Sequence, residues 1–286
     1  MKVDLHIHST FSDGEYTPSQ ILEMCDKLKL DMFAITDHNN LGGSKEVMQL
    51  KRNSNIKIIS GIELNAKAPA NVTKHILGYD FDLEDTSLNE ITKAIMEDNV
   101  RRIKSIISEL YSNFGIKFKD EDVEGLFVPG KNIGRPEVAK LCLKYGYVQN
   151  VEEAFSRLLD PIRDKVVKRK MIPTDKECIK YITKAGGIAC LAHPVSLNKS
   201  VDELRQYIFE LMEVGLSAVE VYHSSNPEKL VYELEKMQKE YGFLTSVGSD
   251  YHGPIVKPGL QIASGKNGNL VNKKATIVSK FREVSL

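Results

Sequence analysis

The segment Val-Asp-Leu-His-Ile-His, residues 3–8, alternates apolar and polar side chains near the start of the chain. Such alternation is typical of a β-strand. Residues two apart in a strand point to the same face of the sheet, with a rise of about 3.3 Å per residue. The imidazoles of His6 and His8 can therefore reach one metal ion. The segment indicates a sheet and a candidate metal site on it.

Strand-like runs and helical patterns alternate through the first and last thirds of the chain. Further strands are expected at 32–36, 57–64, 75–81, 188–192, 218–222 and 243–247, and helices at 17–30, 43–51, 176–185, 201–214 and 227–241. This alternation predicts a parallel sheet with right-handed crossovers. Because the repeats are so many, a closed β/α barrel is favoured over an open sheet.

The middle of the chain breaks this pattern. Helices are expected at 87–114, 136–145 and 151–159, and no convincing strand lies between about residues 85 and 171. We therefore expect a barrel formed by residues 1–85 and 171–286, with residues 86–170 inserted as a helical cap. A basic run, Arg163, Lys165, Lys168, Arg169 and Lys170, either lines the pocket or forms a solvated helix face, and the pattern slightly favours the second.

Composition narrows the class of protein. Among 286 residues, Lys+Arg and Asp+Glu both number 39, so global charge does not steer the protein onto nucleic acid, although a local basic groove remains open. Cys25, Cys142, Cys178 and Cys190 form no C-x-x-C pair and are expected to be small buried side chains in a reducing compartment. No signal peptide pattern and no apolar run near the roughly 20 residues of a membrane span is visible. A cytoplasmic protein without a membrane partner is expected.

The histidines carry the functional signal. His38, His193, His223 and His252 each follow a predicted strand, and carboxylates stand beside several of them. In a β/α barrel the C-terminal ends of the strands converge on one face. Any one of these histidines alone would be an ordinary hydrogen-bonded residue, but chance poorly explains so many. The set expected to converge is His6, His8, Asp13, His38, Glu63, His75, His193, Asp250 and His252, with His223 nearby.

The size of this set indicates several ions. A single zinc site needs about four ligands, and about ten imidazoles and carboxylates are expected here. Two or three divalent ions sharing a bridging carboxylate fit that number, and mixed ligands suit Zn, Mn or Fe better than Ca or Mg. Clustered ions lower the pKa of water and clamp the oxygens of a tetrahedral centre. Hydrolysis of a phosphoester benefits most, and amide or lactam hydrolysis is the competing chemistry.

Five short motifs resemble those of a known family. They are Asp-Leu-His-Ile-His-Ser at 4–9, Thr-Asp-His at 36–38, Gly-Ile-Glu at 61–63, Ala-His-Pro at 192–194 and Gly-Ser-Asp-Tyr-His at 248–252. Their order resembles that of the polymerase and histidinol phosphatase (PHP) superfamily. The resemblance implies an α/β fold with a distorted (β/α)7 barrel, an inserted helical domain and a trinuclear metal centre.

Two further stretches resemble the stand-alone branch of that superfamily, namely Phe-Ser-Asp-Gly-Glu-Tyr-Thr-Pro at 11–18 and Ile-Gly-Arg-Pro at 133–136. This branch includes nucleoside 3′,5′-bisphosphate phosphatases that also trim short RNA from the 5′ end. The resemblance implies a first ion on His6, His8, Glu63 and Asp250, a second sharing Glu63 with His75 and His193, and a third on Asp13, His38 and His252. A hydroxide between the ions would be the nucleophile.

The resemblance also implies roles around the ions. Asp37 would orient a ligand or bridge to solvent. Arg135 would bind a substrate phosphate through its bidentate guanidinium, although without the resemblance it would be taken for a surface residue at a helix start. His223 would touch a phosphate or protonate a leaving oxygen. The chain departs from its relatives at Glu137, where they commonly have histidine, and at 160–167, where they tend to carry a Gly/Lys-rich stretch with an aromatic residue.

The expected function is a metal-dependent phosphoesterase acting on a small nucleotide, of the nucleoside 3′,5′-bisphosphate type, or on the 5′ end of short RNA or DNA. A long nucleic-acid track would need an extended basic groove, so a small capped pocket is favoured. One alternative is a histidinol-phosphate-type phosphatase. Another is a non-catalytic metal-binding module like those attached to some DNA polymerases. No obligate protein partner is evident.

Overall fold

The structure is a computed structural model that describes residues 1–50, 55–68, 72, 74–270 and 275–281. Its strands form two main sheets. One contains β1 (Val3–Ile7), β2 (Met32–Ile35) and β3 (Lys57–Ile59) in that order, and the other contains β4 (Gly61–Asn65), β5 (His75–Tyr79), β6 (Ile188–Leu191), β7 (Ala218–His223) and β8 (Leu244–Gly248) in that order. A two-stranded antiparallel ribbon, β9 (Leu260–Gln261) and β10 (Gly265–Lys266), was not expected from the sequence.

The strand at 57–64 is interrupted, which corrects the sequence prediction. Its first half is β3 and its second half is β4, and the two belong to different sheets. The chain turns at Ser60, whose Oγ donates to the carbonyl of Phe81 at 2.9 Å while its own carbonyl accepts from the N–H of Asp80 at 3.0 Å. At Gly61 a Cβ would lie 2.5 Å from the carbonyl oxygen of Ile35, so only glycine allows this approach.

The direction of β5 is also different from the prediction. This strand runs antiparallel to both of its neighbours, β4 and β6, whereas the other pairs of the two main sheets are parallel. Parallel bridges connect the sheets, one between Ile7 and Tyr251 and one between His38 and Glu63. The described strands therefore form a mixed α/β structure of two sheets joined by isolated bridges, not one continuous barrel of parallel strands.

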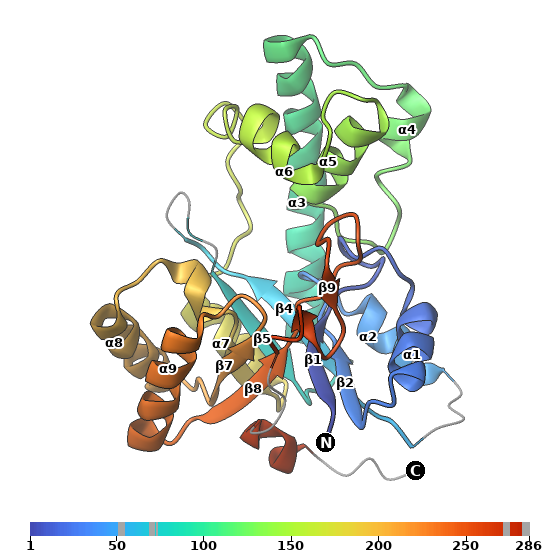
Figure 1. The fold of residues 1–286 in the computed structure, drawn as a ribbon. Coiled ribbons are helices and arrows are strands. Elements are labelled where there is room, and N and C mark those ends of the chain that lie inside the picture. Colours follow the sequence, from blue (N-terminus) through green and yellow to red (C-terminus); the bar gives the residue numbers. More distant parts are fainter. Residues whose placement is uncertain (51–54, 69–71, 73, 271–274, 282–286) are drawn as a thin grey trace.

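Helices flank both sheets where the sequence predicts them. They are α1 (Pro18–Lys27), α2 (Gly42–Gln49), α7 (Asp175–Lys184), α8 (Val201–Met212) and α9 (Glu228–Tyr241). Helices α1 and α2 lie beside β1 and β2, and α7, α8 and α9 lie beside the five-stranded sheet (Figure 1). Capping boxes begin α1 at Thr17, α7 at Thr174 and α8 at Ser200, which explains why these helices start where the polar residues stand.

Residues 86–170 contain helices and no strand, as predicted. The helices are α3 (Thr86–Phe114), α4 (Asp120–Glu124), α5 (Arg135–Lys144) and α6 (Val151–Ala154), followed by the π-helical turn η1 (Phe155–Leu159). Helix α3 rises from the sheets, and the shorter helices gather around its far half (Figure 1). Buried side chains between Ile103 and Val166 form a hydrophobic cluster separate from the clusters around the two sheets.

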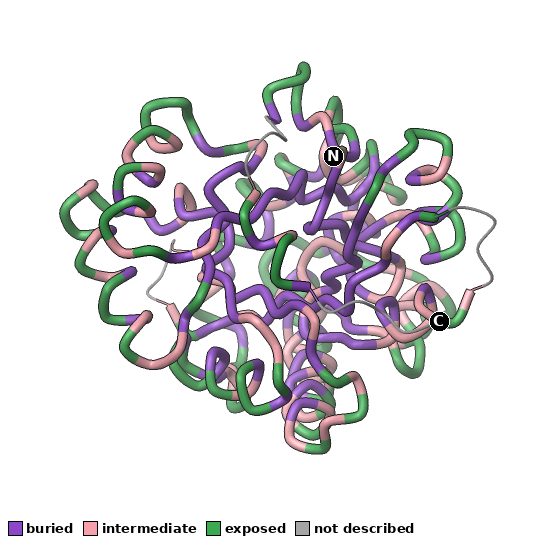
Figure 2. Tube along the Cα trace, turned by 90° about the horizontal axis from the view of Figure 1, so that it is seen from below, coloured by how far each residue is buried: buried purple, intermediate pink, exposed green. Residues whose placement is uncertain are grey.

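Burial follows this layout. Figure 2 shows buried residues along the central strands and exposed residues on the outer helices and loops. All four cysteines are free and buried, as expected. Two 3-10 turns complete the described elements, η2 (Pro194–Leu197) and η3 (Thr276–Lys280). No helix in the described part of the chain is both long and apolar enough to cross a lipid bilayer.

Candidate metal centre

Glu63 of β4 lies at the centre of the predicted set. Its Oε2 is 3.3 Å from His6 Nε2, 3.2 Å from His8 Nε2 and 3.0 Å from His38 Nδ1. Its Oε1 is 2.8 Å from His75 Nδ1 and 2.9 Å from His193 Nε2.

These histidines come from the end of β1, the loop after β2, the start of β5 and the loop after β6, so the fold brings distant segments onto one buried carboxylate. Glu63 is fully buried.

Two aspartates complete the arrangement on the other side of His8. Asp250 Oδ1 lies 3.4 Å from His8 Nε2, and Asp13 Oδ1 lies 3.7 Å from His8 Nδ1. His252 stands between the two carboxylates, with Nε2 3.2 Å from Asp13 Oδ1 and Nδ1 3.4 Å from Asp250 Oδ1.

All nine predicted metal residues and His223 are thus gathered in one place, which we call the histidine cluster. It comprises His6, His8, Asp13, His38, Glu63, His75, His193, His223, Asp250 and His252.

Several atoms of this cluster are buried without a hydrogen-bond partner among the described residues. They are His6 Nε2, His8 Nε2, His38 Nδ1, His223 Nε2, Glu63 Oε2 and Asp13 Oδ1. Leaving such groups buried and unpaired costs free energy, whereas coordination to a cation would satisfy them. Four overlapping groups have ligand atoms close enough to hold an ion: His8, Asp13, His38 and His252; His6, His8 and Asp250; His38, Glu63 and His75; and His6, Glu220 and His223. The residues present therefore fit divalent metal ions.

The charges in the cluster also favour cations. Burial by itself would raise the pKa of Glu63, but His75, His38 and His6 hold it well below its usual range. The pKa of Asp250 is likewise held low, against burial, by Lys257 and His6. Burial lowers the pKa of His75 and of His252 to about 4, so both rings are neutral at pH 7 and keep a lone pair for a metal.

The pKa of His8 is shifted in the opposite direction, upward. Burial lowers its pKa, but the nearby carboxylates of Asp250 and Glu63 outweigh burial and raise the pKa to about 9. The charged ring balances the carboxylates, and a divalent cation has to displace its proton in order to bind.

Asp37 lies behind the cluster. Its carboxylate accepts hydrogen bonds from the N–H of Ser9 at 2.8 Å, from Ser9 Oγ at 2.6 Å and from Ser12 Oγ at 2.6 Å. Ser12 Oγ in turn lies 3.3 Å from His8 Nδ1. Because the Ser12 hydroxyl donates to Asp37, it can accept a hydrogen bond from His8, so Asp37 fixes the His8 ring through Ser12.

His223 has a different proton arrangement from the other histidines. Its Nδ1 accepts a hydrogen bond from the backbone N–H of Ser225 at 3.0 Å, and its Nε2 lies 3.5 Å from Asp250 Oδ2. Burial lowers its pKa, so the ring is neutral at pH 7. Since the Nδ1 lone pair is already used, the proton stays on Nε2. His223 therefore presents a donor, and not a free lone pair, to the cluster.

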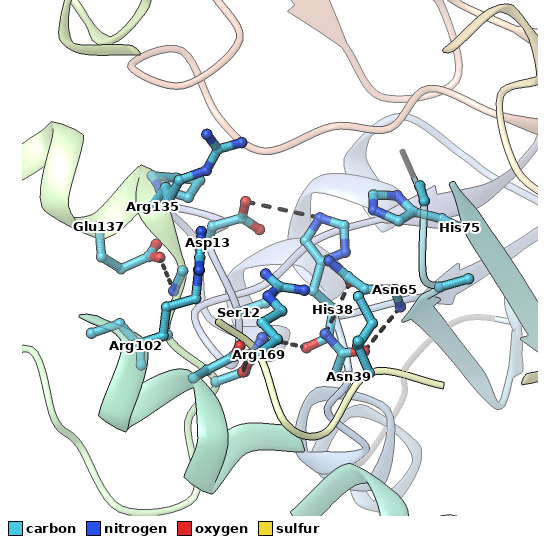
Figure 3. A pocket seen from close by; sticks show the side chains of 18 of the residues that line it. Ser12, Asp13, His38, Asn39, Asn65, His75, Arg102, Arg135, Glu137 and Arg169 are labelled. Carbon is cyan, nitrogen blue, oxygen red and sulfur yellow. Dashed lines mark hydrogen bonds and ion pairs between the residues drawn. The ribbon is translucent and has the colours of Figure 1, made fainter. Parts of the chain in front are cut away.

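A cavity of about 640 Å³ opens beside the cluster. His38, His75 and Asp13 line it on one side, and Arg102, Arg135, Arg163 and Arg169 line it next to the helical stretch. Figure 3 shows Arg102, Arg135 and Arg169 around the cavity with His38 and His75 across from them. We call this the arginine cavity.

A second hollow of about 440 Å³ lies over the cluster. It shares Asp13, His38 and His75 with the arginine cavity, together with Pro136 and Phe155.

The arginines are close to one another. Arg135 Nη1 lies 3.0 Å from Asp160 Oδ1, and Arg163 Nη2 lies 2.6 Å from the same oxygen. Burial and the neighbouring Arg102 lower the pKa of Arg169 to about 10. Residues 163–170 form turns and loop and no helix, so the predicted solvated helix face was wrong. Arg163 and Arg169 line the cavity, whereas Lys165, Lys168 and Lys170 are exposed.

Three residues of this region were missed from the sequence. Arg102 lies in the middle of α3, where nothing distinguishes it from other charged helix residues. Lys257 forms an ion pair with Asp250 and comes from a segment without a strand or helix. Glu220 is a fully buried carboxylate in β7, and its place between two valines of an apolar strand was a signal that could have been read.

Glu137, which the resemblance singled out, is buried at its carboxyl group. Its Oε2 accepts from the N–H of Gly134 at 2.9 Å, and its Oε1 accepts no hydrogen bond from a described residue but lies 3.8 Å from Lys140 Nζ. Burial and the nearby Asp13 raise its pKa to about 8. Glu137 is one of the residues that line the arginine cavity.

Comparisons with known proteins agree with this geometry. The PHP domain family profile matches residues 4–172. The chain is 28% identical over 290 residues to a 5′-3′ exoribonuclease of Haemophilus influenzae, covering 98% of this chain and 99% of that protein. It is 24% identical over 259 residues to a 3′,5′-nucleoside bisphosphate phosphatase of Chromobacterium violaceum, covering 88% and 87%.

Solved structures share the fold. A crystal structure assigned as a metal-dependent phosphoesterase of Bifidobacterium adolescentis superposes with a TM-score of 0.81 at 24% identity, covering 99% of this chain and 97% of that one. An amidohydrolase of Chromobacterium violaceum with bound sulfate and no metal gives a TM-score of 0.81 at 22% identity, covering 98% and 95%.

Proposed function

The chain belongs to the PHP domain family as a metal-dependent phosphoesterase, and from this premise we propose that it hydrolyses a phosphate ester of a nucleoside 3′,5′-bisphosphate. The observation that carries the proposal is the arginine cavity, which opens directly beside the histidine cluster. A substrate with two phosphates can place one at the cluster and the other among the arginines. Guanidinium groups suit the second phosphate because they bind its oxygens in bidentate fashion.

The roles of the cluster residues follow from their contacts. Two or three divalent ions, for which Zn, Mn and Fe are the candidates, would be held by the nine predicted residues, would lower the pKa of water and would offset the charge of the phosphate. Asp37, acting through Ser12, keeps His8 Nε2 directed at Glu63 and Asp250.

His223 serves as a hydrogen-bond donor to the leaving group. In the hydrolysis, the bond from phosphorus to the ribose oxygen breaks, the hydroxyl of the attacking water stays on phosphorus and the other proton of that water ends on the ribose oxygen. His223 Nε2 donates a hydrogen bond to this leaving oxygen, because the Ser225 N–H occupies Nδ1 and keeps the ring proton on Nε2. Arg135 holds a phosphate oxygen, and the ring of Phe155 lies 5.0 Å from its guanidinium and restricts its position.

The 5′ end of a short oligonucleotide is the second candidate substrate. The hollow of about 440 Å³ over the cluster, which adjoins the arginine cavity, leaves space for a nucleotide attached beyond the scissile phosphate. The same bond to the ribose oxygen would then break, so one chemistry serves both substrates. The basic side chains line a cavity and not a long track, which fits a short strand end.

The other two alternatives are less well supported. Histidinol phosphate has one phosphate and an amine, and its positive charge would be repelled by the arginines of the cavity. A non-catalytic module would not need the buried donor that His223 presents beside the cluster.

We also propose the division of the chain into a metal-binding part, residues 1–85 and 171–286, and a helical cap, residues 86–170. The separate hydrophobic cluster between Ile103 and Val166 supports this division. The cap contributes Arg102, Arg135, Arg163 and Arg169 to the pocket.

The test is a comparison of substrates with the Mn-loaded protein. We expect adenosine 3′,5′-bisphosphate to be hydrolysed with a higher kcat/KM than histidinol phosphate, and a 5′-phosphorylated RNA dinucleotide to be cleaved as well. Hydrolysis of histidinol phosphate in preference to the bisphosphate would contradict the proposal. Full binding of Mn without hydrolysis of any phosphate ester would favour the non-catalytic module.

A further inference from the structure

Glu220 holds two members of the histidine cluster at once. Its Oε1 lies 2.9 Å from His6 Nδ1, and its Oε2 accepts a hydrogen bond from the backbone N–H of His193 at 2.7 Å. His6 comes from β1 and His193 from the loop after β6, while Glu220 stands on β7 between them. All three side chains are buried. Both carboxylate oxygens are therefore occupied by protein donors, although the carboxylate lies close enough to His6 and His223 to form an ion-binding group with them.

The surrounding structure makes room for this carboxylate. A Cβ at Gly248 would lie 2.5 Å from Glu220 Oε1 and 2.2 Å from His6 Cβ, so a side chain at Gly248 would displace both groups. Asn226 Nδ2 donates to the carbonyls of Glu220 and Val221, each at 3.0 Å, and fixes the end of the strand. The position of Glu220 is thus determined from several sides.

The backbone of His193 needs an anchor. Its φ of +25° and ψ of 69° lie in a region that residues with a Cβ rarely adopt. In this conformation His193 Nε2 is 2.9 Å from Glu63 Oε1. The hydrogen bond from the His193 N–H to Glu220 holds the backbone where the side chain can reach Glu63.

We propose that Glu220 is a positioning residue that couples two ion sites, fixing the His6 proton on Nδ1 and holding His193 against Glu63, without binding an ion itself. A carboxylate can only accept a hydrogen bond, so Glu220 keeps a proton on Nδ1 of His6 and leaves Nε2, which lies 3.3 Å from Glu63 Oε2 and 3.5 Å from Asp250 Oδ1, as the atom that can bind an ion. This inference rests on the proposed metal-dependent function.

Glu220→Gln is the sharpest test because it changes one oxygen into an NH₂ group without changing the shape. The amide has one acceptor for two donors. If the NH₂ group faces His6, it must donate to Nδ1, which moves the ring proton to Nε2. If it faces His193 instead, two donors, the NH₂ group and the backbone N–H, meet without an acceptor. We expect the apparent affinity for Mn to fall about 10- to 100-fold and the Mn content at limiting metal to decrease, while far-UV circular dichroism stays unchanged.

Glu235→Gln is the matched control. Glu235 also contacts a β7 residue, since it accepts a hydrogen bond from Tyr222 Oη at 2.9 Å, but it faces away from the cluster on α9. Its substitution should leave the Mn affinity unchanged. A Glu220→Gln protein that is folded and binds Mn as the unsubstituted protein does would overturn the proposal.

A measurement on the unsubstituted protein tests the same point if Glu220→Gln does not fold. The nitrogen chemical shifts of the His6 ring in the Mn-free protein should show a protonated Nδ1 in direct contact with a carboxylate. A neutral His6 with its proton on Nε2 alone would overturn the proposal. The proposed function fails separately, if the unsubstituted protein binds Mn and hydrolyses no phosphate ester.

Discussion

The histidine cluster and the arginine cavity adjoin each other, yet they are built differently. The cluster is made of short, mostly buried side chains at or near the ends of strands, and several are held by a neighbour behind them, as Asp37 and Ser12 hold His8. The cavity is made of long, partly exposed arginines from helices and loops of residues 86–170. Positions on strands are rigid, whereas long side chains on a cap adjust. We conclude that the reaction depends on the first region and substrate preference on the second.

The largest expected effect on activity comes from substitutions in the histidine cluster, and it tests that region apart from the arginine cavity. The double substitution His6→Ala and His8→Ala removes two buried imidazoles that face Glu63. Turnover of the bisphosphate should fall by more than about 1000-fold with loss of bound Mn, since even residues behind a ligand contribute about 10- to 100-fold each. Elemental analysis and a phosphate-release assay measure both. Activity unchanged in the double variant would refute the mechanism.

A second effect concerns the pH dependence of the cluster. The pKa of His8 is raised to about 9, so a divalent ion must displace a proton at any lower pH. The apparent Mn affinity should rise up to about tenfold per pH unit between pH 7 and pH 9, as judged by titration calorimetry. The arginines stay charged over this range, so binding of inorganic phosphate to the cavity should not follow the same curve. A flat Mn affinity would show that His8 has no proton to lose.

The raised pKa of His8 also predicts how the stability of the Mn-free protein depends on pH. A histidine with a raised pKa in the folded state stabilises the fold fully below its unfolded pKa of about 6.5, and this contribution disappears as the pH rises through about 9. The melting temperature of the Mn-free protein should therefore decrease over that interval. Saturating Mn should reduce the decrease.

A smaller effect is expected in the cavity. Arg169→Ala removes one guanidinium that lines it, and KM for adenosine 3′,5′-bisphosphate should rise about 10- to 100-fold with little change in kcat, because charged hydrogen bonds contribute about 1.5–3 kcal/mol. Lys168→Ala changes an exposed residue of the same run and serves as the control. Equal effects of the two substitutions would mean that the cavity does not bind the second phosphate.

Mn binding by the histidine cluster should change least when a residue in the hydrophobic core of the helical stretch is substituted. Ile106 is buried in the hydrophobic core of the helical stretch, which is separate from the hydrophobic cores around the two sheets. Ile106→Ala should lower the free energy of unfolding by about 2–5 kcal/mol in urea titrations. The affinity for Mn should not change. A parallel loss of Mn would show that the two regions are not independent.

Part of this arrangement could be predicted from the sequence. His6 and His8 share a face because a strand repeats every two residues, and that rule is local. Helix starts at Thr17, Thr174 and Ser200 follow from capping side chains a few residues away. The histidines after successive strands were placed correctly because strand ends gather at one end of such folds.

Other features depended on contacts between distant segments. The reversal of β5 and the turn at Ser60 leave no pattern in the run of apolar residues, since a strand looks the same in either direction. Arg102 and Arg169 are 67 positions apart, and only the packing of the helical stretch turns them toward one cavity.

The sequence by itself thus determined most of the helices and strands and which residue types can bind metal, because secondary structure and side-chain chemistry depend largely on near neighbours. Only the tertiary structure decided which ring nitrogen of His6 and of His223 carries the proton. Glu220 accepts from His6 Nδ1 and the Ser225 N–H occupies His223 Nδ1, so His6 faces the cluster with Nε2 as a possible metal ligand and His223 faces it with a hydrogen-bond donor. That difference arises from hydrogen bonds to particular partners, and those partners are set by the fold.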